Sequence, residues 1–477
     1  MLTSDSPADG VRPYSTRLRT AIVLTGTGTA GAYHAGVLRA FHEAGLRLDL
    51  VAARGIGSVG AMFAAVDGGQ RLWDRAGLWK GGSLAHAYRW RLPLRIAGWA
   101  MAVAAALLAT PLVIFGLGVV ASLLALLLKL LTFDAASVAV TSGYSRMLDV
   151  LFAPAALPTI VPGLIVASLI VAVAALGVSL ALSLWRAPIR RRLREGAVWR
   201  LVGAPLSSAS VLERATVELW NLIRGAAAVA PPPRADLAKR YVELLAENLG
   251  QPGFRELLLV THDMDARRDI VFALLGETQR NRFFSRGTGD GARAAEAFDL
   301  AGVARDQAID VLAASLAIPV ATDPHLLRFA ADGPWRGETH RLCDRPASLE
   351  RVLEEVAAAG AEQVIVLSAA PPPSRPHELS AGRGDLRGRA AEQLASFEAG
   401  DLRDAVMRIQ GRVVSVYVIR PAHNPLGPLD FGGIYDERSD RQYSVAELVD
   451  RGYEDAYHQF IDPVVAASGE RIETVHS

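Results

Sequence analysis

Two glycine-rich turns near the start of the chain hold the residues best suited to chemistry. The first turn runs from Gly26 to Gly31, after an apolar run and before a helical pattern. The second places Ser58 between a short apolar run and another helical pattern, with Gly57 before it and Gly60 after it. Small neighbours let a chain turn sharply enough to present a serine hydroxyl above a sheet. The spacing therefore predicts a nucleophilic Ser58 in an elbow formed with Gly57 and Gly60.

The first turn suits the binding of a developing negative charge. Its backbone N–H groups, at Gly26, Thr27 and Gly28, would form an oxyanion hole for an acyl-transfer intermediate. Ser58 would sit at a helix N-terminus, where backbone N–H groups and the helix dipole also favour negative charge. One turn would supply the hydrogen-bond donors and the other the nucleophile, on adjacent parallel strands.

A dinucleotide site is the alternative for the same stretch. Gly26, Gly28 and Gly31 match the G-x-G-x-x-G pattern, and Asp49 follows at about the spacing of a ribose-binding acid. That hypothesis leaves the second turn, at Ser58, without a role. We therefore favour the acyl-transfer site over the dinucleotide site.

The elements around the two turns predict a parallel α/β sheet. Apolar runs over residues 22–24 and 48–52 alternate with helical patterns, which is typical of βαβ units. Further strands are expected over residues 254–261, 364–367 and 413–419, with helices over residues 236–249, 307–316 and 346–359.

Two long uncharged runs interrupt this pattern. No charged residue lies between Ile96 and Leu128, nor between Phe152 and Trp185. A membrane span needs about 20 apolar residues, so we predict transmembrane segments at about 96–128 and 160–185. A kink is expected at Pro111, and residues 129–151 between the runs are expected to form a loop.

The charges beside these runs predict their orientation. Both outer flanks are rich in arginine and the connection between the runs is not, so both flanks belong in the cytoplasm. The flanking arginines are Arg89, Arg91 and Arg95 before the first run and Arg186, Arg190, Arg191, Arg192 and Arg194 after the second. Two spans return the chain to its starting side. We therefore expect an N-terminal tail (1–19), a first half-domain (20–91), a membrane insert (92–195) and a second half-domain (196–477).

Composition excludes several classes of protein. The 477 residues carry a formal net charge of +1, which gives no electrostatic case for binding nucleic acid. The single cysteine, Cys343, excludes an internal disulfide. The ten histidines lack metal-ligand spacing. We expect no metal and no organic cofactor.

The ordered motifs resemble those of the patatin-like phospholipases. Residues 26–31 look like that family's Gly-Gly-Gly-x-Arg-Gly loop, and residues 56–60 look like its Gly-x-Ser-x-Gly elbow. Residues 313–319 are similar to its Ala-Ser-x-Ala-Ile-Pro stretch, and Asp332-Gly333-Pro334 stands where the family has Asp-Gly-Gly. The resemblance covers about 20–70 and 250–420.

This resemblance implies a three-layer patatin-like fold with a mainly parallel central sheet, interrupted by the membrane insert. It implies a serine acyl hydrolase with a Ser58–Asp332 dyad that acts without cofactor on phospholipids or related lipids. Together with the membrane insert and its arginine-rich flanks, this predicts action on membrane lipids from the cytoplasmic side of the inner membrane. Thr27, Ala30 and Ile56 replace a family glycine, arginine and glycine. A catalytically impaired member that binds lipid or acts as a scaffold is therefore the main alternative.

The remaining aspartates and His34 are given structural roles. We expect Asp67 in a turn after the second helix and Asp344 in a turn or as the N-cap of the next helix. Asp263 and Asp265 end a strand, Asp430 is expected in a turn, and His34 is expected to be structural.

Overall fold

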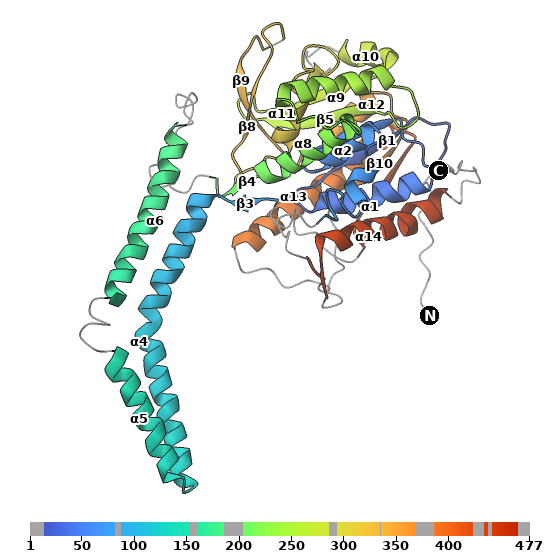
Figure 1. Ribbon diagram of the computed structural model, residues 1–477. Helices are drawn as coiled ribbons and strands as arrows, with labels where there is room; N and C mark the ends of the chain where they lie inside the picture. The colour runs from blue at the N-terminus through green and yellow to red at the C-terminus, as the bar shows by residue number, and fades with distance from the viewer. Residues whose placement is uncertain are drawn as a thin grey trace, which may run out of the picture. The chain divides into compact units, whose positions relative to one another are not determined.

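The computed structural model describes residues 14–81, 87–151, 160–185, 204–285, 293–333, 335–368, 386–422, 434–436 and 441–465. They form two compact units (Figure 1). The first unit joins the chain up to Arg89 to the chain from Leu206 onward, and the second runs from Trp90 to Pro205. Asp430 and the arginines after the second apolar run lie outside the described residues.

A mixed, mainly parallel sheet forms the centre of the α/β unit. Its strand order is β11-β10-β1-β2-β5-β6-β7, and the β8–β9 hairpin pairs with the end of β5. Strands β11, β10, β1, β2 and β5 are parallel, whereas β6 runs antiparallel to β5. The sheet strands are β1 (Thr20–Leu24), β2 (Leu50–Ala53), β5 (Glu256–Asp263), β6 (Arg268–Leu274), β7 (Glu296–Asp299), β8 (His325–Arg328), β9 (Thr339–Cys343), β10 (Gln363–Leu367) and β11 (Ser415–Ile419).

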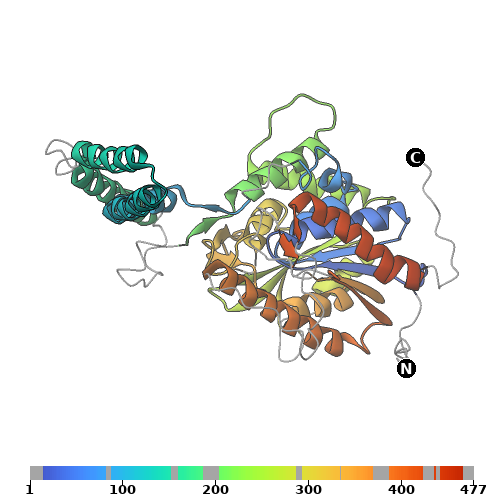
Figure 2. The same ribbon diagram turned by 90° about the horizontal axis from the view of Figure 1, so that it is seen from below.

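Helices cover both faces of this sheet, so the unit has three layers (Figure 2). Alternate residues of β1 face opposite ways: Ile22 and Leu24 join one apolar core, Ala21 and Val23 the other. Because both faces are covered, the central strands carry continuous apolar runs, such as residues 21–24 of β1 and 364–367 of β10. The helices of the first face are α1 (Ala30–Glu43), α2 (Gly57–Ala65), α8 (Ala209–Ile223), α9 (Arg234–Asn248), α11 (Ala308–Ser315) and α14 (Val445–Ala456), and those of the second are α10 (Glu277–Phe284), α12 (Leu349–Ala358) and α13 (Leu386–Ile409). The smaller elements are α3 (Gln70–Trp73), β3 (Arg89–Trp90), β4 (Leu206–Ser207), β12 (Ile434–Asp436), β13 (Arg441–Tyr443) and a π-helix over Tyr457–Val465.

The second unit consists of three helices, α4 (Leu92–Leu130), α5 (Asp134–Leu151) and α6 (Ile160–Trp185). Two helical stretches, Leu92–Leu130 and Pro162–Leu182, are long and apolar enough to cross a membrane, and only 11% of the most apolar window of each is buried. Helix α4 continues through Pro111. Its 39 residues span about 58 Å, more than the roughly 30 Å of a hydrocarbon core.

The expected loop over residues 129–151 is wrong, because most of it forms α5. The polar residues of this segment bond to α4. The Ser137 hydroxyl donates to the Ala125 carbonyl (2.9 Å) and the Tyr144 hydroxyl to the Ile114 carbonyl (3.1 Å). Hydroxyls that face a neighbouring helix are common between helices in membranes. Because α5 contacts α4 partly through such polar residues, a prediction based on apolar residues alone misses this helix.

The two ends of the second unit lie side by side, since the Arg91 N–H donates to the Pro205 carbonyl (3.1 Å). We therefore expect that deleting residues 92–204 and joining the ends with a short glycine linker leaves a folded α/β unit. It should stay in the supernatant after ultracentrifugation without detergent and melt cooperatively. Aggregation of this variant, with the full chain stable in detergent, would show that the second unit is needed for folding.

Candidate functional site

The loop after β1 has the geometry that its glycines allow. Gly26 and Gly28 have φ of 103° and 59°, a region that side chains other than glycine rarely adopt. The N–H groups of Gly26, Thr27 and Gly28 donate no hydrogen bond to any residue that the structure describes. Buried N–H groups without acceptors are rare. This glycine loop therefore offers three donors to a ligand oxygen.

The turn after β2 packs directly against the glycine loop. The Ile56 N–H donates to the Gly26 carbonyl and the Arg54 N–H to the Leu24 carbonyl, both at 3.1 Å. A Cβ at Gly57 would lie 2.3 Å from the Leu24 carbonyl oxygen, so only glycine fits there. Ile56 has φ of −64° and is unstrained, although it replaces a glycine of the family pattern.

Ser58 does not stand at the apex of this turn. It is the second residue of α2, completely buried, and its hydroxyl has no hydrogen-bond partner among the described residues. The left-handed residue of the turn is Gly55, with φ of 56°, three positions earlier. A nucleophile elbow places its serine on the strained apex itself, and here that position has no side chain. Gly60 lies farther along α2, where a Cβ would approach Leu24 Cδ1 at 3.1 Å.

The carboxylate at this turn belongs to Asp344, not to Asp332. Asp332 is exposed in the connection between β8 and β9, and Ser58 makes no hydrogen bond to it. Asp344 directly follows β9 and is buried. Its Oδ2 lies 2.9 Å from the position that a Cβ would take at Gly55. The N-cap of α12 is Ser348, so the N-cap role expected for Asp344 is wrong.

Arg54 occupies the space between Asp344 and α13. Its Nη1 lies 3.2 Å from Asp344 Oδ2, and its Nη2 lies 3.3 Å from Glu398 Oε1. The three side chains are 2%, 1% and 8% exposed, so the cluster is closed to water. Burial raises the pKa of Asp344 and of Glu398, and the Arg54 charge opposes that rise. Burial also disfavours the Arg54 charge, but the two carboxylates outweigh it and raise the pKa of Arg54.

His34 and Trp79 complete the enclosure. His34 is fully buried in α1, and burial, followed by the Arg54 charge, lowers its pKa to about 3. The imidazole is therefore neutral and a poor base, which fits the structural role expected for it. A Cβ at Gly31 would lie 2.2 Å from the Trp79 ring and 3.0 Å from Ile56 Cγ1, so the indole lies against both turns.

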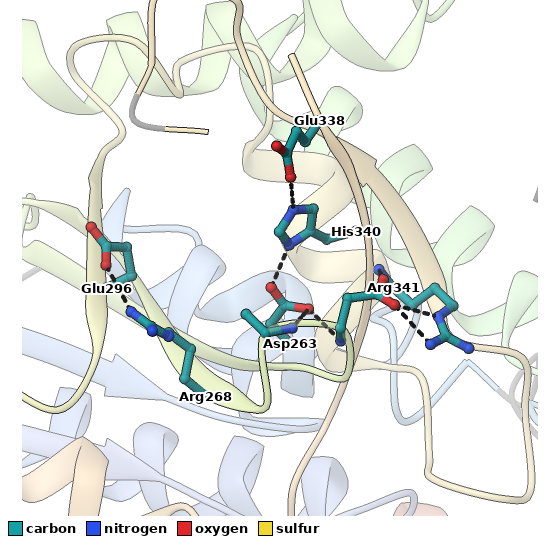
Figure 3. Close-up of polar contacts among 8 residues, drawn as sticks. Asp263, Arg268, Glu296, Glu338, His340 and Arg341 are labelled. Atoms are coloured by element: carbon teal, nitrogen blue, oxygen red, sulfur yellow. Dashed lines mark hydrogen bonds and ion pairs between the residues drawn. The ribbon is translucent and has the colours of Figure 1, made fainter. Parts of the chain in front are cut away.

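Asp263 and Asp265 bond to residues of β9, an arrangement that the sequence did not reveal. Figure 3 shows the contacts from Asp263 to His340 and from His340 to Glu338. Asp263 Oδ2 bonds His340 Nδ1 at 2.5 Å, and His340 Nε2 lies 3.1 Å from Glu338 Oε2. Asp265 accepts hydrogen bonds from the Arg341 backbone and guanidinium. Burial disfavours the His340 charge, but the Asp263 and Glu338 carboxylates outweigh it and raise the pKa of His340. This network fixes the strand that ends at Asp344.

The position of Asp49 argues against the dinucleotide hypothesis, which needs this residue to bind a ribose. Asp49 precedes β2, and its Oδ2 accepts the Thr20 N–H (2.9 Å) at the start of β1. A ribose-binding acid belongs at the carboxyl end of its strand, whereas Asp49 lies at the opposite end of the sheet from the glycine loop. Among the described residues, no group of three or more metal-ligating side chains is present.

Gly55 should tolerate no side chain. A Cβ there would lie 2.3 Å from the Gly26 carbonyl oxygen, and its φ is left-handed. We expect Gly55→Ala to lower the free energy of unfolding by about 2–3 kcal/mol, seen as a lower melting temperature in tryptophan fluorescence. Gly98→Ala, where nothing lies within 4 Å of the new methyl group, is the matched control. Equal melting temperatures for both variants would contradict the geometry of this turn.

Comparisons with known proteins add little to this site. No family model and no curated protein matches the chain. Among solved structures, the chain is similar to the crystal structure of VipD from Legionella pneumophila, at a TM-score of 0.28 and 12% identity. The match covers 93% of this chain and 66% of VipD. So low a TM-score carries no conclusion about shared fold or activity, and the site rests on its own geometry.

Proposed function

We propose that the chain is a membrane-anchored protein of patatin-like fold that binds an acyl lipid at the glycine loop without hydrolysing it. The observation that carries this proposal is the turn after β2, whose left-handed apex beside Asp344 is Gly55. Hydrolysis through a Ser–Asp dyad needs a hydroxyl at that apex. A glycine there removes the nucleophile and leaves the N–H groups of the glycine loop in place.

The other half of the dyad is also altered. Asp344 directly follows β9, but Arg345 and Pro346 stand where the family's Asp-Gly-Gly motif has two glycines. Its carboxylate is bonded by Arg54. A general base needs a free lone pair within reach of the proton that it accepts. We infer that Asp344 serves the buried ion cluster and not proton transfer.

The free donors of the glycine loop support binding of a carbonyl or carboxylate oxygen. Three buried N–H groups without an acceptor in the described part of the chain gain most from an oxygen-bearing ligand. The two apolar helices support a lipid as the source of that oxygen, because anchoring raises the local concentration of membrane lipids. By the arginine-rich flanks we place the α/β unit on the cytoplasmic side. Protease digestion of right-side-out and inverted vesicles tests that placement, and cleavage only in right-side-out vesicles would refute it.

A fluorophosphonate probe tests the absence of hydrolysis. We expect the detergent-purified chain and Ser58→Ala to be labelled equally, at background level, while a known serine hydrolase in the same reaction is labelled fully. Labelling of the wild type that disappears in Ser58→Ala would refute the proposal.

Lipid binding needs a separate measurement. We expect a phosphatidylcholine with a diazirine on its acyl chain, reconstituted in nanodiscs with the full chain, to cross-link to peptides around the glycine loop. Excess unlabelled oleate should suppress these cross-links. Cross-links confined to residues 92–130 and 160–185 would show that lipid meets only the apolar helices, and would refute binding at the loop.

A serine acyl hydrolase acting through Ser58 is the second candidate. The observation in its favour is the Ser58 hydroxyl, which lies in the first turn of α2 without a hydrogen-bond partner among the described residues. A buried hydroxyl with no partner costs free energy, and such costs are common at active sites. In this case Asp344 would take the role expected for Asp332. Fluorophosphonate labelling of the wild type that is lost in Ser58→Ala would favour this hydrolase over the lipid-binding protein.

A further inference from the structure

A cavity lined by arginines lies on the second face of the sheet, beside α10 and α12 (labelled in Figure 1). Its volume is about 750 Å³. Four arginines and two glutamates line it: Arg282, Arg293, Arg351, Arg412, Glu354 and Glu355. The lining therefore carries two more positive than negative charges. We call it the arginine cavity.

One of the four arginines has a purely structural role. Arg293 Nε lies 3.3 Å from Glu355 Oε1, and a second ion pair joins the same two residues. The Arg293 guanidinium also lies 4.1 Å from the centre of the Phe283 ring. Both side chains are nearly buried, and the two opposite charges neutralise each other.

Two of the other three arginines share the carboxylate of Glu354. Arg351 is paired with Glu354, and Arg412 Nη1 lies 3.7 Å from the other oxygen of the same group. Arg282 has no carboxylate within ion-pair distance among the residues that the structure describes. One carboxylate therefore compensates two guanidinium groups, and Arg282 adds a third, so the cavity lining keeps positive charge and hydrogen-bond donors.

Stabilisation of helix ends accounts for only part of this arrangement. Arg282 lies in the last turn of α10, where a positive charge is favourable. Arg351 lies in the first turn of α12, where the helix dipole disfavours a cation, and Arg412 precedes β11 outside any helix. The clustering of these three side chains around one cavity therefore needs another cause.

We propose that the arginine cavity binds the phosphate group of a ligand. Guanidinium groups match phosphate oxygens in geometry and charge, and several around one pocket are a common basis of phosphate recognition. The cavity includes the end of α12, which leads into the start of β10, whereas the glycine loop follows the end of β1. Since β1 and β10 are parallel, the two sites lie at opposite ends of the sheet. This proposal therefore stands independently of the proposed function.

Inorganic pyrophosphate and phosphatidic acid are the two probes that identify the source of the phosphate. Calorimetry with the full chain in neutral detergent measures pyrophosphate binding. Flotation with vesicles of phosphatidylcholine, with and without phosphatidic acid, measures headgroup binding by the variant lacking residues 92–204. If that variant does not fold, nanodiscs of the same two compositions and the full chain replace the vesicles, with bound phosphatidic acid counted after purification.

The double variant Arg282→Gln/Arg412→Gln should bind phosphate at least about a hundredfold more weakly, about tenfold for each arginine. Both side chains are exposed, so folding should be unaffected. Arg403→Gln, on the surface of α13, is the matched control and should bind like the wild type. Saturable pyrophosphate binding indicates a soluble ligand, and binding only to phosphatidic acid indicates a lipid headgroup. Absence of both, or equal binding by the double variant and the wild type, would overturn the proposal.

Discussion

Replacing Arg54 by methionine should lower the free energy of unfolding by about 3–5 kcal/mol, because it leaves the buried Asp344 and Glu398 carboxylates without their cation. Arg54 is 2% exposed and has an oxygen of each carboxylate within 3.3 Å. The melting temperature of Arg54→Met, measured by intrinsic tryptophan fluorescence in detergent, should fall well below that of the wild type. A loss of this size would make much of the chain insoluble on expression.

Two further variants make this result specific. Arg39→Gln removes an exposed ion pair with Glu43, four residues along α1, and should cost less than about 1 kcal/mol. The triple variant Arg54→Met/Asp344→Leu/Glu398→Leu removes all three charges together and should recover most of the lost stability. A melting temperature for Arg54→Met equal to that of Arg39→Gln would show that the cluster is not closed to water.

Acidification should destabilise the protein through His34. Its pKa in the folded chain is about 3, below the ordinary value of 6.5, so the unfolded chain binds the extra proton first. The contribution of the neutral imidazole to the free energy of unfolding is complete above pH 6.5 and is lost as the pH falls toward 3. Over this range the free energy of unfolding falls by about 1.4 kcal/mol per pH unit. Between pH 6.5 and 4.5 the wild type should lose about 2–3 kcal/mol more than His34→Gln.

Other buried groups act in the opposite direction. Burial raises the pKa of Asp344, Glu398 and Asp401, so these groups favour folding more as the pH falls toward their unfolded values. The comparison with His34→Gln cancels their contribution. His458→Gln, at an exposed histidine, should follow the wild-type profile. Parallel profiles for the wild type and His34→Gln would show that His34 is not buried as a neutral group.

Most of the central sheet could be predicted from the sequence, because its strands are covered on both faces and are therefore apolar throughout. The runs at residues 22–24 and 364–367 pair as neighbouring parallel strands β1 and β10. Helix α5 and the β8–β9 hairpin could not be predicted in this way. Helix α5 contacts α4 through side-chain hydroxyls. The β8–β9 hairpin contains polar residues such as His340, which bonds to Asp263 in a distant part of the chain.

The site was harder to predict than the fold. The pattern around Ser58 matches an elbow in composition, but the backbone makes its left-handed turn at Gly55. Motif spacing cannot show which glycine adopts a positive φ. The motif order favours Asp332, which stands where the family has Asp-Gly-Gly, whereas the position of Asp344 depends on the β8–β9 hairpin that carries it to Arg54. Such long-range pairing leaves no local signal.

The strand order has a consequence for biosynthesis. β1 lies between β2 and β10, and its first residue, Thr20, is paired with Gln363, which is synthesised much later. The apolar helices α4 and α6 leave the ribosome before β10 and before Glu398. If they span the membrane as proposed, they reach the translocon while the sheet is still incomplete. The α/β unit would then fold on a nascent chain already tethered to the bilayer, with the open edge of β1 exposed until the last third of the protein is made.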